Sequence, residues 1–196
     1  MMLGFLLARA GVKAVVLEKH GDFLRDFRGD TVHPSTLNVM DELGLLDEFL
    51  KLPHQQVSRF GAQFGDERVQ VADFSHLPVR CGFIAMMPQW DFLDFLAAQG
   101  KRYPAFTALM QRRGDGLIEE DGKVVGVRAT VDGKPQEIRA DLVVGADGRH
   151  STVRAGAGFE VKVLGAPMDV LWFRLTPQAQ PTRPRPWAAS TAAASW

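Results

Sequence analysis

A carboxylate follows an apolar run near the start of the chain, and this position suits it to bind the hydroxyl groups of a ribose. The run Val12–Leu17 is rich in β-branched residues and is followed directly by Glu18 and Lys19. Apart from Lys13 the run is apolar, and an apolar run of this length predicts a strand of a parallel sheet that is covered on both faces. Glu18 is therefore expected at the carboxyl edge of that sheet, where open α/β sheets bind their ligands.

The residues before this strand predict only part of a dinucleotide-binding unit. Residues 1–10 are apolar on most faces and predict a short buried helix that ends at Gly11 in the left-handed conformation. In a complete unit, a Gly-rich turn precedes the helix, and an acid about 20 residues later binds the ribose. Glu18 has that position if the last glycine of the turn lies just before Met1, so the first strand and the turn are expected to be missing. Taken alone, such a unit is more often purely structural.

A second carboxylate, that of Asp147, follows another apolar run. Leu142–Val144 predicts the last strand of a β-meander, and it leads into Gly145-Ala146-Asp147-Gly148. That strand would bring Asp147 to the carboxyl edge, where Gly148 permits close approach of the backbone to a ligand. Ser151 and Arg154 then open a helix.

Two further polar residues lie close to predicted helices. Arg28 stands in a polar loop ahead of a helix over 35–49, for which Ser35 is the candidate N-cap and Gly44 a soft interruption. Gln89 heads an amphipathic helix over 89–98.

The remaining segments predict antiparallel β-structure. Residues 59–74 predict a hairpin, and residues 117–144 predict a β-meander because they contain two Asp-Gly dipeptides, which are typical hairpin turns. Residues 163–175 predict one further strand. Residues 176–196 contain no acidic residue and show no periodicity, so we expect no regular structure there. The segment is interpreted either as a linker or as an aberrant end of the chain.

The composition argues against several other kinds of protein. Lys and Arg together number 23, as do Asp and Glu, so the charge gives no support for binding nucleic acid or an anionic membrane surface. Cys81 is the only cysteine and the five histidines are scattered, so neither a disulfide nor a metal site is expected. No apolar run is long enough to cross a membrane. We expect a cytoplasmic protein, of an oligomeric state that the sequence leaves open.

The order and spacing of four motifs resemble the para-hydroxybenzoate hydroxylase-like family of FAD-dependent aromatic-ring monooxygenases. The resemblance extends over roughly residues 1–175, and the motif at Ala140–Arg154 is the most specific because it is similar to the family's Asp-Gly motif. The other three motifs are the unit at 1–18 and the segments Arg28–Leu37 and Pro88–Leu93.

The resemblance implies an α/β fold with a Rossmann-like FAD-binding parallel sheet, a β-meander and part of a substrate-domain β-sheet. It divides the chain into three kinds of segment: a partial FAD-binding domain at 1–54 and 86–160, a partial substrate-binding sheet at 55–85 and 161–175, and an irregular tail at 176–196.

The resemblance also implies roles for single residues. Glu18 would bind the adenosine ribose of FAD, and the guanidinium of Arg28 would lie against the cofactor. Gln89 would hydrogen-bond the pyrophosphate or ribityl region, and Asp147 would touch the cofactor and help position the nicotinamide donor. No catalytic residue is predicted. The predicted cofactor-binding set is Glu18, Lys19, Arg28, Gln89, Asp147 and Gly148.

The reaction of the resembling family implies FAD as cofactor, NAD(P)H as reductant, and O2-dependent hydroxylation of a small aromatic substrate through a flavin C4a-hydroperoxide. The family's later Gly-Asp motif has no counterpart after residue 154, and the Gly-rich turn is missing as well. We therefore expect weak or no FAD binding and no turnover by these 196 residues alone. Two alternatives stay open: another FAD- or nicotinamide-dependent oxidoreductase, and a catalytically inactive nucleotide-binding module.

Overall fold

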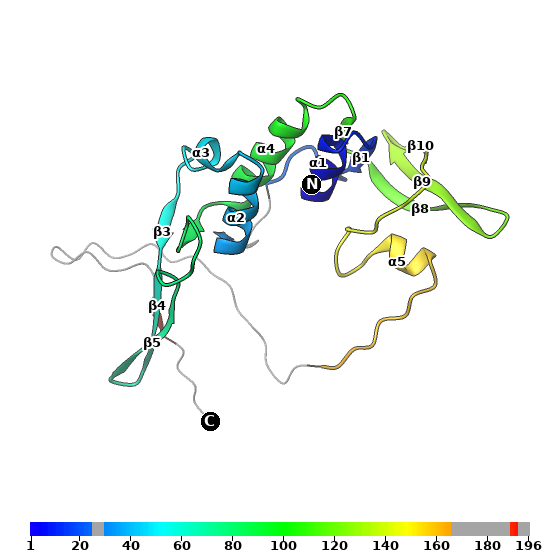
Figure 1. Cartoon of the computed structure of the whole chain (residues 1–196). Helices are drawn as coiled ribbons and strands as arrows, with labels where there is room; N and C mark the ends of the chain where they lie inside the picture. Colours follow the sequence, from blue (N-terminus) through cyan, green and yellow to red (C-terminus); the bar gives the residue numbers. More distant parts are fainter. Residues whose placement is uncertain (25–29, 166–188, 192–196) are drawn as a thin grey trace. The chain divides into compact units, whose positions relative to one another are not determined.

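The computed structural model describes residues 1–24, 30–165 and 189–191 of the chain. The chain forms two compact units, the first made of Met1–Leu24 with Leu96–Val170 and the second of Arg25–Phe95 with Leu171–Trp196. Most helices and strands of both units are labelled in Figure 1.

In the first unit, an N-terminal helix packs on a two-stranded parallel sheet. Helix α1 spans Met2–Arg9 and is followed by Gly11 at a φ of 82°, in the left-handed region. Strand β1 (Ala14–Leu17) pairs in parallel with β7 (Phe106–Leu109), and the side chain of Phe5 in α1 is buried. The predicted order of helix, glycine and parallel strand is confirmed.

Helix α1 approaches β1 closely because Gly4 has no side chain. A Cβ atom built on Gly4 would overlap Cγ2 of Val16 and would lie 3.4 Å from the ring of Phe106. Val16 is β-branched and therefore has little freedom to turn away. The absence of a side chain at this position thus sets the distance between the helix and the sheet.

The first unit also contains the predicted β-meander. Strands β8 (Arg113–Glu120), β9 (Lys123–Val131) and β10 (Lys134–Arg139) pair in antiparallel order. Both residues of Asp121-Gly122 and of Asp132-Gly133 have positive φ angles, as a two-residue hairpin turn of type I′ requires. Helix α5 (Thr152–Gly156) packs against β8.

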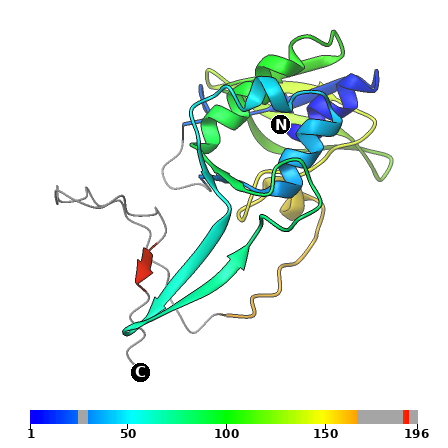
Figure 2. The same cartoon turned by 60° about the vertical axis from the view of Figure 1, so that its left-hand side comes forward.

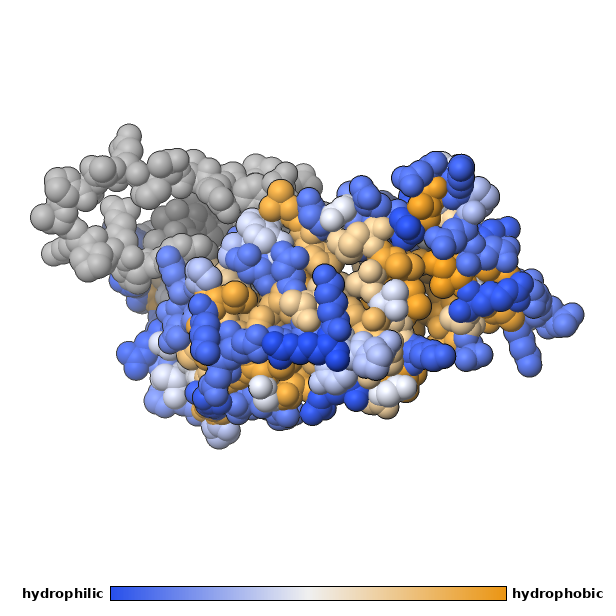
Figure 3. Space-filling view, turned by 90° about the horizontal axis from the view of Figure 1, so that it is seen from above, coloured by the Kyte–Doolittle hydropathy of each residue, from blue (hydrophilic) through white to orange (hydrophobic). Residues whose placement is uncertain are grey.

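The predicted strand Leu142–Val144 is wrong, because these residues form no strand. Leu142 and Val144 are 77% and 52% exposed, and none of the described strands pairs with them. Without a partner strand, an apolar run cannot satisfy its backbone groups in a sheet. Coverage of β1 is also less complete than predicted, since Val15 is 49% exposed. On the face shown in Figure 3, apolar residues (orange) lie among polar residues (blue).

The second unit is built on a three-stranded antiparallel sheet with strand order β2-β6-β3. In its core, the buried ring of Phe49 lies 5.5 Å from that of Phe92 and 5.2 Å from that of Phe95, both in edge-to-face geometry. The elements are β2 (Thr31–Val32), β6 (Ile84–Met86), β3 (Gln55–Val57), α2 (Pro34–Glu42), α3 (Leu46–Phe49) and α4 (Gln89–Gly100), which begins in this unit.

A hairpin of two longer strands confirms the prediction for residues 59–74. Strands β4 (Arg59–Phe64) and β5 (Glu67–Asp73) are antiparallel, as Figure 2 shows. Strand β11 (Ala189–Thr191) pairs in parallel with β4. Phe64, the last residue of β4, has a side chain that is 57% exposed.

The helix predicted over 35–49 is in fact two helices, α2 and α3. Gly44 between them has a φ of 71°, which ends the first helix rather than softly interrupting one long helix. The prediction of Ser35 as N-cap is wrong as well, since α2 begins at Pro34 with His33 as its N-cap residue. Proline is favoured at the first helical position because its missing N–H has no partner there in any case.

Some predictions lie outside the described residues, namely Arg28 and the 166–175 part of the strand predicted over 163–175. The described part of that segment, residues 163–165, forms no strand. Of the tail predicted to be irregular, Ala189–Thr191 forms β11. The division into FAD-binding and substrate-binding segments stays a prediction.

We predict that Gly4→Ala lowers the melting temperature of the chain. Alanine favours a helix over glycine by about 1 kcal/mol. The overlap of its methyl group with Val16 opposes this gain, at a cost of about 1–3 kcal/mol. Thermal unfolding followed by circular dichroism measures the balance. In the double variant Gly4→Ala/Val16→Ala the methyl group of Ala has room. The fall in its melting temperature should therefore be smaller than the sum of the falls in the two single variants. A raised melting temperature in Gly4→Ala would contradict the close packing.

Candidate functional site

The carboxyl edge of the parallel sheet is formed by the loops that follow β1 and β7. Backbone hydrogen bonds join these loops beyond the ends of the strands: the N–H of Glu18 donates to the carbonyl of Leu109 at 2.9 Å, and that of Arg112 donates to the carbonyl of Glu18 at 2.8 Å. The N–H of His20 donates to Oε1 of Glu18 at 2.9 Å. This last bond orients the carboxylate of Glu18, which is half-buried.

The positive end of α1 lies at the same edge of the sheet. No side chain caps the N-terminus of α1. The amino group of Met1 is partly buried, and burial lowers its pKa while the charge of Glu18 acts in the opposite direction. The carboxylate of Glu18 is therefore close enough to the start of α1 to interact with it electrostatically. A helix N-terminus and a carboxylate at one sheet edge are typical of sites for the phosphates and ribose of a nucleotide.

Asp147 is held by the start of helix α5 (Thr152–Gly156). Its Oδ1 accepts a hydrogen bond from Oγ of Ser151, and its Oδ2 accepts from the N–H groups of Thr152 at 2.7 Å and Val153 at 3.3 Å. The same Oγ of Ser151 accepts from the N–H of Arg154 at 2.9 Å, which confirms Ser151 as the N-cap.

These hydrogen bonds decide the charge state of Asp147. Partial burial acts to raise its pKa, but the hydrogen bonds from Ser151, Val153, its own backbone and Thr152 together outweigh burial, so the pKa lies below its usual value. Both carboxylate oxygens are thus already engaged by the chain itself. Gly148, the next residue, has a φ of 86°, which a residue with a side chain rarely adopts.

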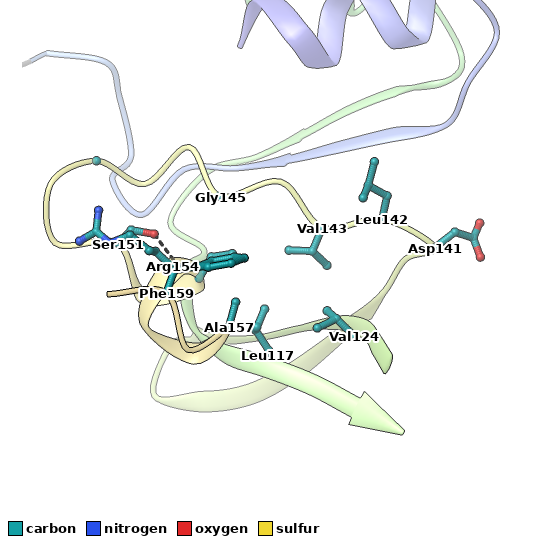
Figure 4. Close-up of a pocket in the computed structure, with 12 residues that line it drawn as sticks. Leu117, Val124, Asp141, Leu142, Val143, Gly145, Ser151, Arg154, Ala157 and Phe159 are labelled. Atoms are coloured by element: carbon teal, nitrogen blue, oxygen red, sulfur yellow. Dashed lines mark hydrogen bonds between the residues drawn. The ribbon is translucent and has the colours of Figure 1, made fainter. Parts of the chain in front are cut away.

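A cavity of about 450 Å³ lies between the Asp-Gly loop, the meander and α5. Figure 4 shows Leu117, Val124 and Val143 around it, with Ser151 and Arg154 near its other end. The lining is mostly apolar, so the cavity suits an apolar group and offers no pair of acid and base for catalysis.

The structure places the predicted cofactor-binding residues in three locations. Glu18 and the exposed Lys19 lie together at the edge of the parallel sheet, and Asp147 and Gly148 lie together in the loop before α5. Gln89 is the first residue of α4, as predicted, and it belongs to the second unit.

Two features of these loops were not predicted from the sequence. The carboxylate of Asp147 caps α5, although the spacing of Asp147 from Ser151 and Thr152 is a possible signal for such a cap. Gln111 adopts a φ of 54°, for which a glutamine in a sequence gives no signal.

Other classes of site find no support in the described part of the chain. Across residues 1–24, 30–165 and 189–191 no group of three His, Cys, Asp or Glu side chains is arranged to hold a metal ion. No helix among those residues is long and apolar enough to cross a membrane. The thiol of Cys81 is buried, and burial raises its pKa, so it is a poor nucleophile.

Comparison with known sequences identifies the family. The family described as FAD binding domain matches residues 1–193. The chain is 31% identical over 183 residues to the 6-methylpretetramide 4-monooxygenase of Streptomyces rimosus, an alignment that covers 93% of this chain and 44% of that protein. It is 32% identical over 159 residues to the rifampicin monooxygenase of Streptomyces venezuelae, covering 79% of this chain and 30% of that protein.

Solved structures show the same fold. OxyS anhydrotetracycline hydroxylase from Streptomyces rimosus superimposes with a TM-score of 0.65 at 27% identity, covering 80% of this chain and 31% of that chain. PqsL, a probable FAD-dependent monooxygenase from Pseudomonas aeruginosa, superimposes with a TM-score of 0.69 at 24% identity. The superposition covers 85% of this chain and 44% of that chain.

The α/β fold and the sheet edge define the class as that of nucleotide-binding domains. Within that class, the chain belongs to the FAD-binding domain family, and its resemblance to FAD-dependent aromatic monooxygenases is confirmed. The predicted fold class and FAD as the family's cofactor are confirmed with it. The chain spans less than half the length of the relatives named above.

We predict that Asp147→Ala lowers the free energy of unfolding in a pH-dependent way. Because the pKa of Asp147 is lowered in the folded chain, its carboxylate stabilises the fold above the unfolded-state pKa of about 3.9. This contribution is lost as the pH falls through the lower folded-state pKa. Urea unfolding should therefore show a loss of about 1 kcal/mol at pH 7 that shrinks toward pH 3.

The control for this prediction is Asp141→Ala, which removes an exposed carboxylate from the same segment. It should show little pH-dependent loss. A difference between Asp147→Ala and the wild-type chain that stays constant between pH 7 and pH 3 would contradict the capping role of the ionised carboxylate.

Proposed function

We propose that this chain binds the adenosine part of FAD through Glu18 and serves as the FAD-binding part of a monooxygenase that hydroxylates a small aromatic substrate. The observation that carries the proposal is the carboxylate of Glu18 at the carboxyl edge of β1, oriented by the N–H of His20 and close to the uncapped start of α1. A carboxylate oriented in this way accepts hydrogen bonds from the two ribose hydroxyls.

The groups present fit the adenosine part of FAD better than its pyrophosphate. The start of α1 offers backbone N–H groups that no side chain caps, which suits a phosphate. The chain contains no Gly-x-Gly-x-x-Gly sequence, so the turn that usually wraps the pyrophosphate is not among its 196 residues. We therefore propose that this chain binds free FAD weakly.

The other predicted residues have roles that fit this proposal. The backbone at Gly148 can approach the cofactor, while Asp147 holds that loop against α5. The amide of Gln89, half-buried at the start of α4, has both a donor and acceptor for the pyrophosphate or ribityl groups. Arg28 and Lys19 would supply positive charge near the phosphates.

FAD, when bound, supplies the redox chemistry of the reaction, and NAD(P)H is the proposed reductant. The proposal of an aromatic substrate is supported by relatives whose names state such a reaction, including a probable NADH-specific resorcinol 4-hydroxylase from Rhodococcus jostii. That protein is 30% identical over 168 residues. A cytoplasmic location is proposed from the single cysteine.

We predict that Glu18→Gln weakens binding of both ADP and FAD by about tenfold. The variant keeps the size of the side chain but removes a charged acceptor, and a hydrogen bond to a charged group is worth about 1.5–3 kcal/mol. Titration calorimetry with ADP, FAD and FMN measures the effect. FAD should bind more tightly than ADP, and FMN, which lacks adenosine, should bind least. Glu119→Gln, which changes an exposed glutamate of β8, is the matched control and should bind as the wild-type chain does.

Two outcomes would overturn the proposal. One is FMN binding as tight as FAD binding; the other is ADP binding that does not change in Glu18→Gln. ADP binding without any preference for FAD would instead indicate a catalytically inactive nucleotide-binding module.

A further inference from the structure

Gln111 has a backbone conformation that its residue type does not favour. Among the described residues, three that are not glycine have a positive φ: Gln111 at 54°, Asp121 at 50° and Asp132 at 48°. Asp121 and Asp132 are the first residues of Asp-Gly hairpin turns, which require this conformation. Gln111 is in no such turn, and a strained residue that local structure does not explain points to a functional site.

The conformation of Gln111 is fixed from both sides by the loops at the edge of the parallel sheet. Its N–H donates to the carbonyl of His20 at 2.9 Å, two residues after Glu18. Nη1 of Arg112 donates to the carbonyls of Met110 at 3.3 Å and of Gln111 at 3.4 Å. Nε of Arg112 is buried without a hydrogen-bond partner in the described structure. An uncompensated polar atom is a further cost of this arrangement.

The side chain of Gln111 lies beside the backbone of Gly21. A Cβ atom built on Gly21 would lie 3.4 Å from Nε2 of Gln111 and 3.7 Å from its Cδ. The amide of Gln111 therefore lies over the backbone of the loop that follows Glu18, on an exposed side chain that solvent or a ligand can reach.

We propose that the amide of Gln111 binds the purine base of the nucleotide whose ribose Glu18 binds. An amide has both a donor and an acceptor, and adenine presents an amino group beside a ring-nitrogen acceptor, so the two pair through two hydrogen bonds. The proposal rests on the proposed function, and it adds a specificity-determining residue to the same edge. The left-handed conformation holds this amide next to the loop of Glu18.

We predict that Gln111→Gly separates binding from folding. Glycine adopts a positive φ at no steric cost, so the variant should melt at the same temperature as the wild-type chain or higher. Its affinity for AMP should nevertheless fall about three- to tenfold, because the hydrogen bonds to the base are lost. Its affinity for ribose 5-phosphate, which has no base, should stay unchanged. Titration calorimetry and thermal unfolding measure the two effects.

Three further variants make the result decisive. Asp132→Gly makes the same kind of change in the meander and should leave AMP binding unchanged. Gln111→Asn keeps an amide but shortens its reach, so it should lose AMP affinity as well. Glu18→Gln should weaken AMP and ribose 5-phosphate alike.

AMP binding by Gln111→Gly that equals that of the wild-type chain overturns the role of Gln111. If Glu18→Gln still weakens both ligands in that case, the proposed function stands without it. No AMP binding by the wild-type chain, or binding that Glu18→Gln leaves unchanged, overturns the proposed function and the role of Gln111 together.

Discussion

The candidate nucleotide site depends on the parallel pairing of β1 with β7. The pairing does not stop where the strands end, because backbone hydrogen bonds continue from Glu18 to Leu109 and Arg112. Backbone bonds of this kind do not depend on the identity of the side chains around them. The place of the Glu18 carboxylate is thus set by the sheet itself, and Gly4 adds to it by allowing α1 to pack closely on β1.

The loop of Asp147 is organised in a different way, by local contacts alone. Its carboxylate accepts hydrogen bonds from Ser151, Thr152 and Val153, all within six residues of it. A carboxylate has about four sites that can accept a hydrogen bond, and the backbone N–H of Asp147 itself joins these three donors, so the chain already engages them. Contact of this loop with a cofactor therefore falls more naturally to the backbone at Gly148 than to the carboxylate. This sharpens the sequence hypothesis, in which Asp147 itself touches the cofactor.

The sequence predicted what local patterns determine and missed what depends on distant partners. The position of Glu18 and the hairpin turns followed from periodicity and from Asp-Gly pairs, which act over a few residues. Leu142–Val144 has the composition of a strand, but a strand also needs a neighbour, and none of the described strands provides one. Gln111 could not be singled out, because its conformation depends on a hydrogen bond to His20, which is far away in the sequence.

Binding and chemistry separate cleanly in this chain. The described residues offer a carboxylate, a helix N-terminus and amide groups, which under the proposed function bind and orient a nucleotide, but they contain no paired acid and base in a cavity. This is what a flavin-dependent reaction requires of a cofactor-binding domain, since the cofactor carries the electron transfer and the protein supplies position. Under the proposed function, affinity for adenosine nucleotides is therefore the property that these residues control directly. Turnover depends in addition on a closed, dry substrate pocket, which a mostly apolar cavity beside the Asp-Gly loop does not by itself provide.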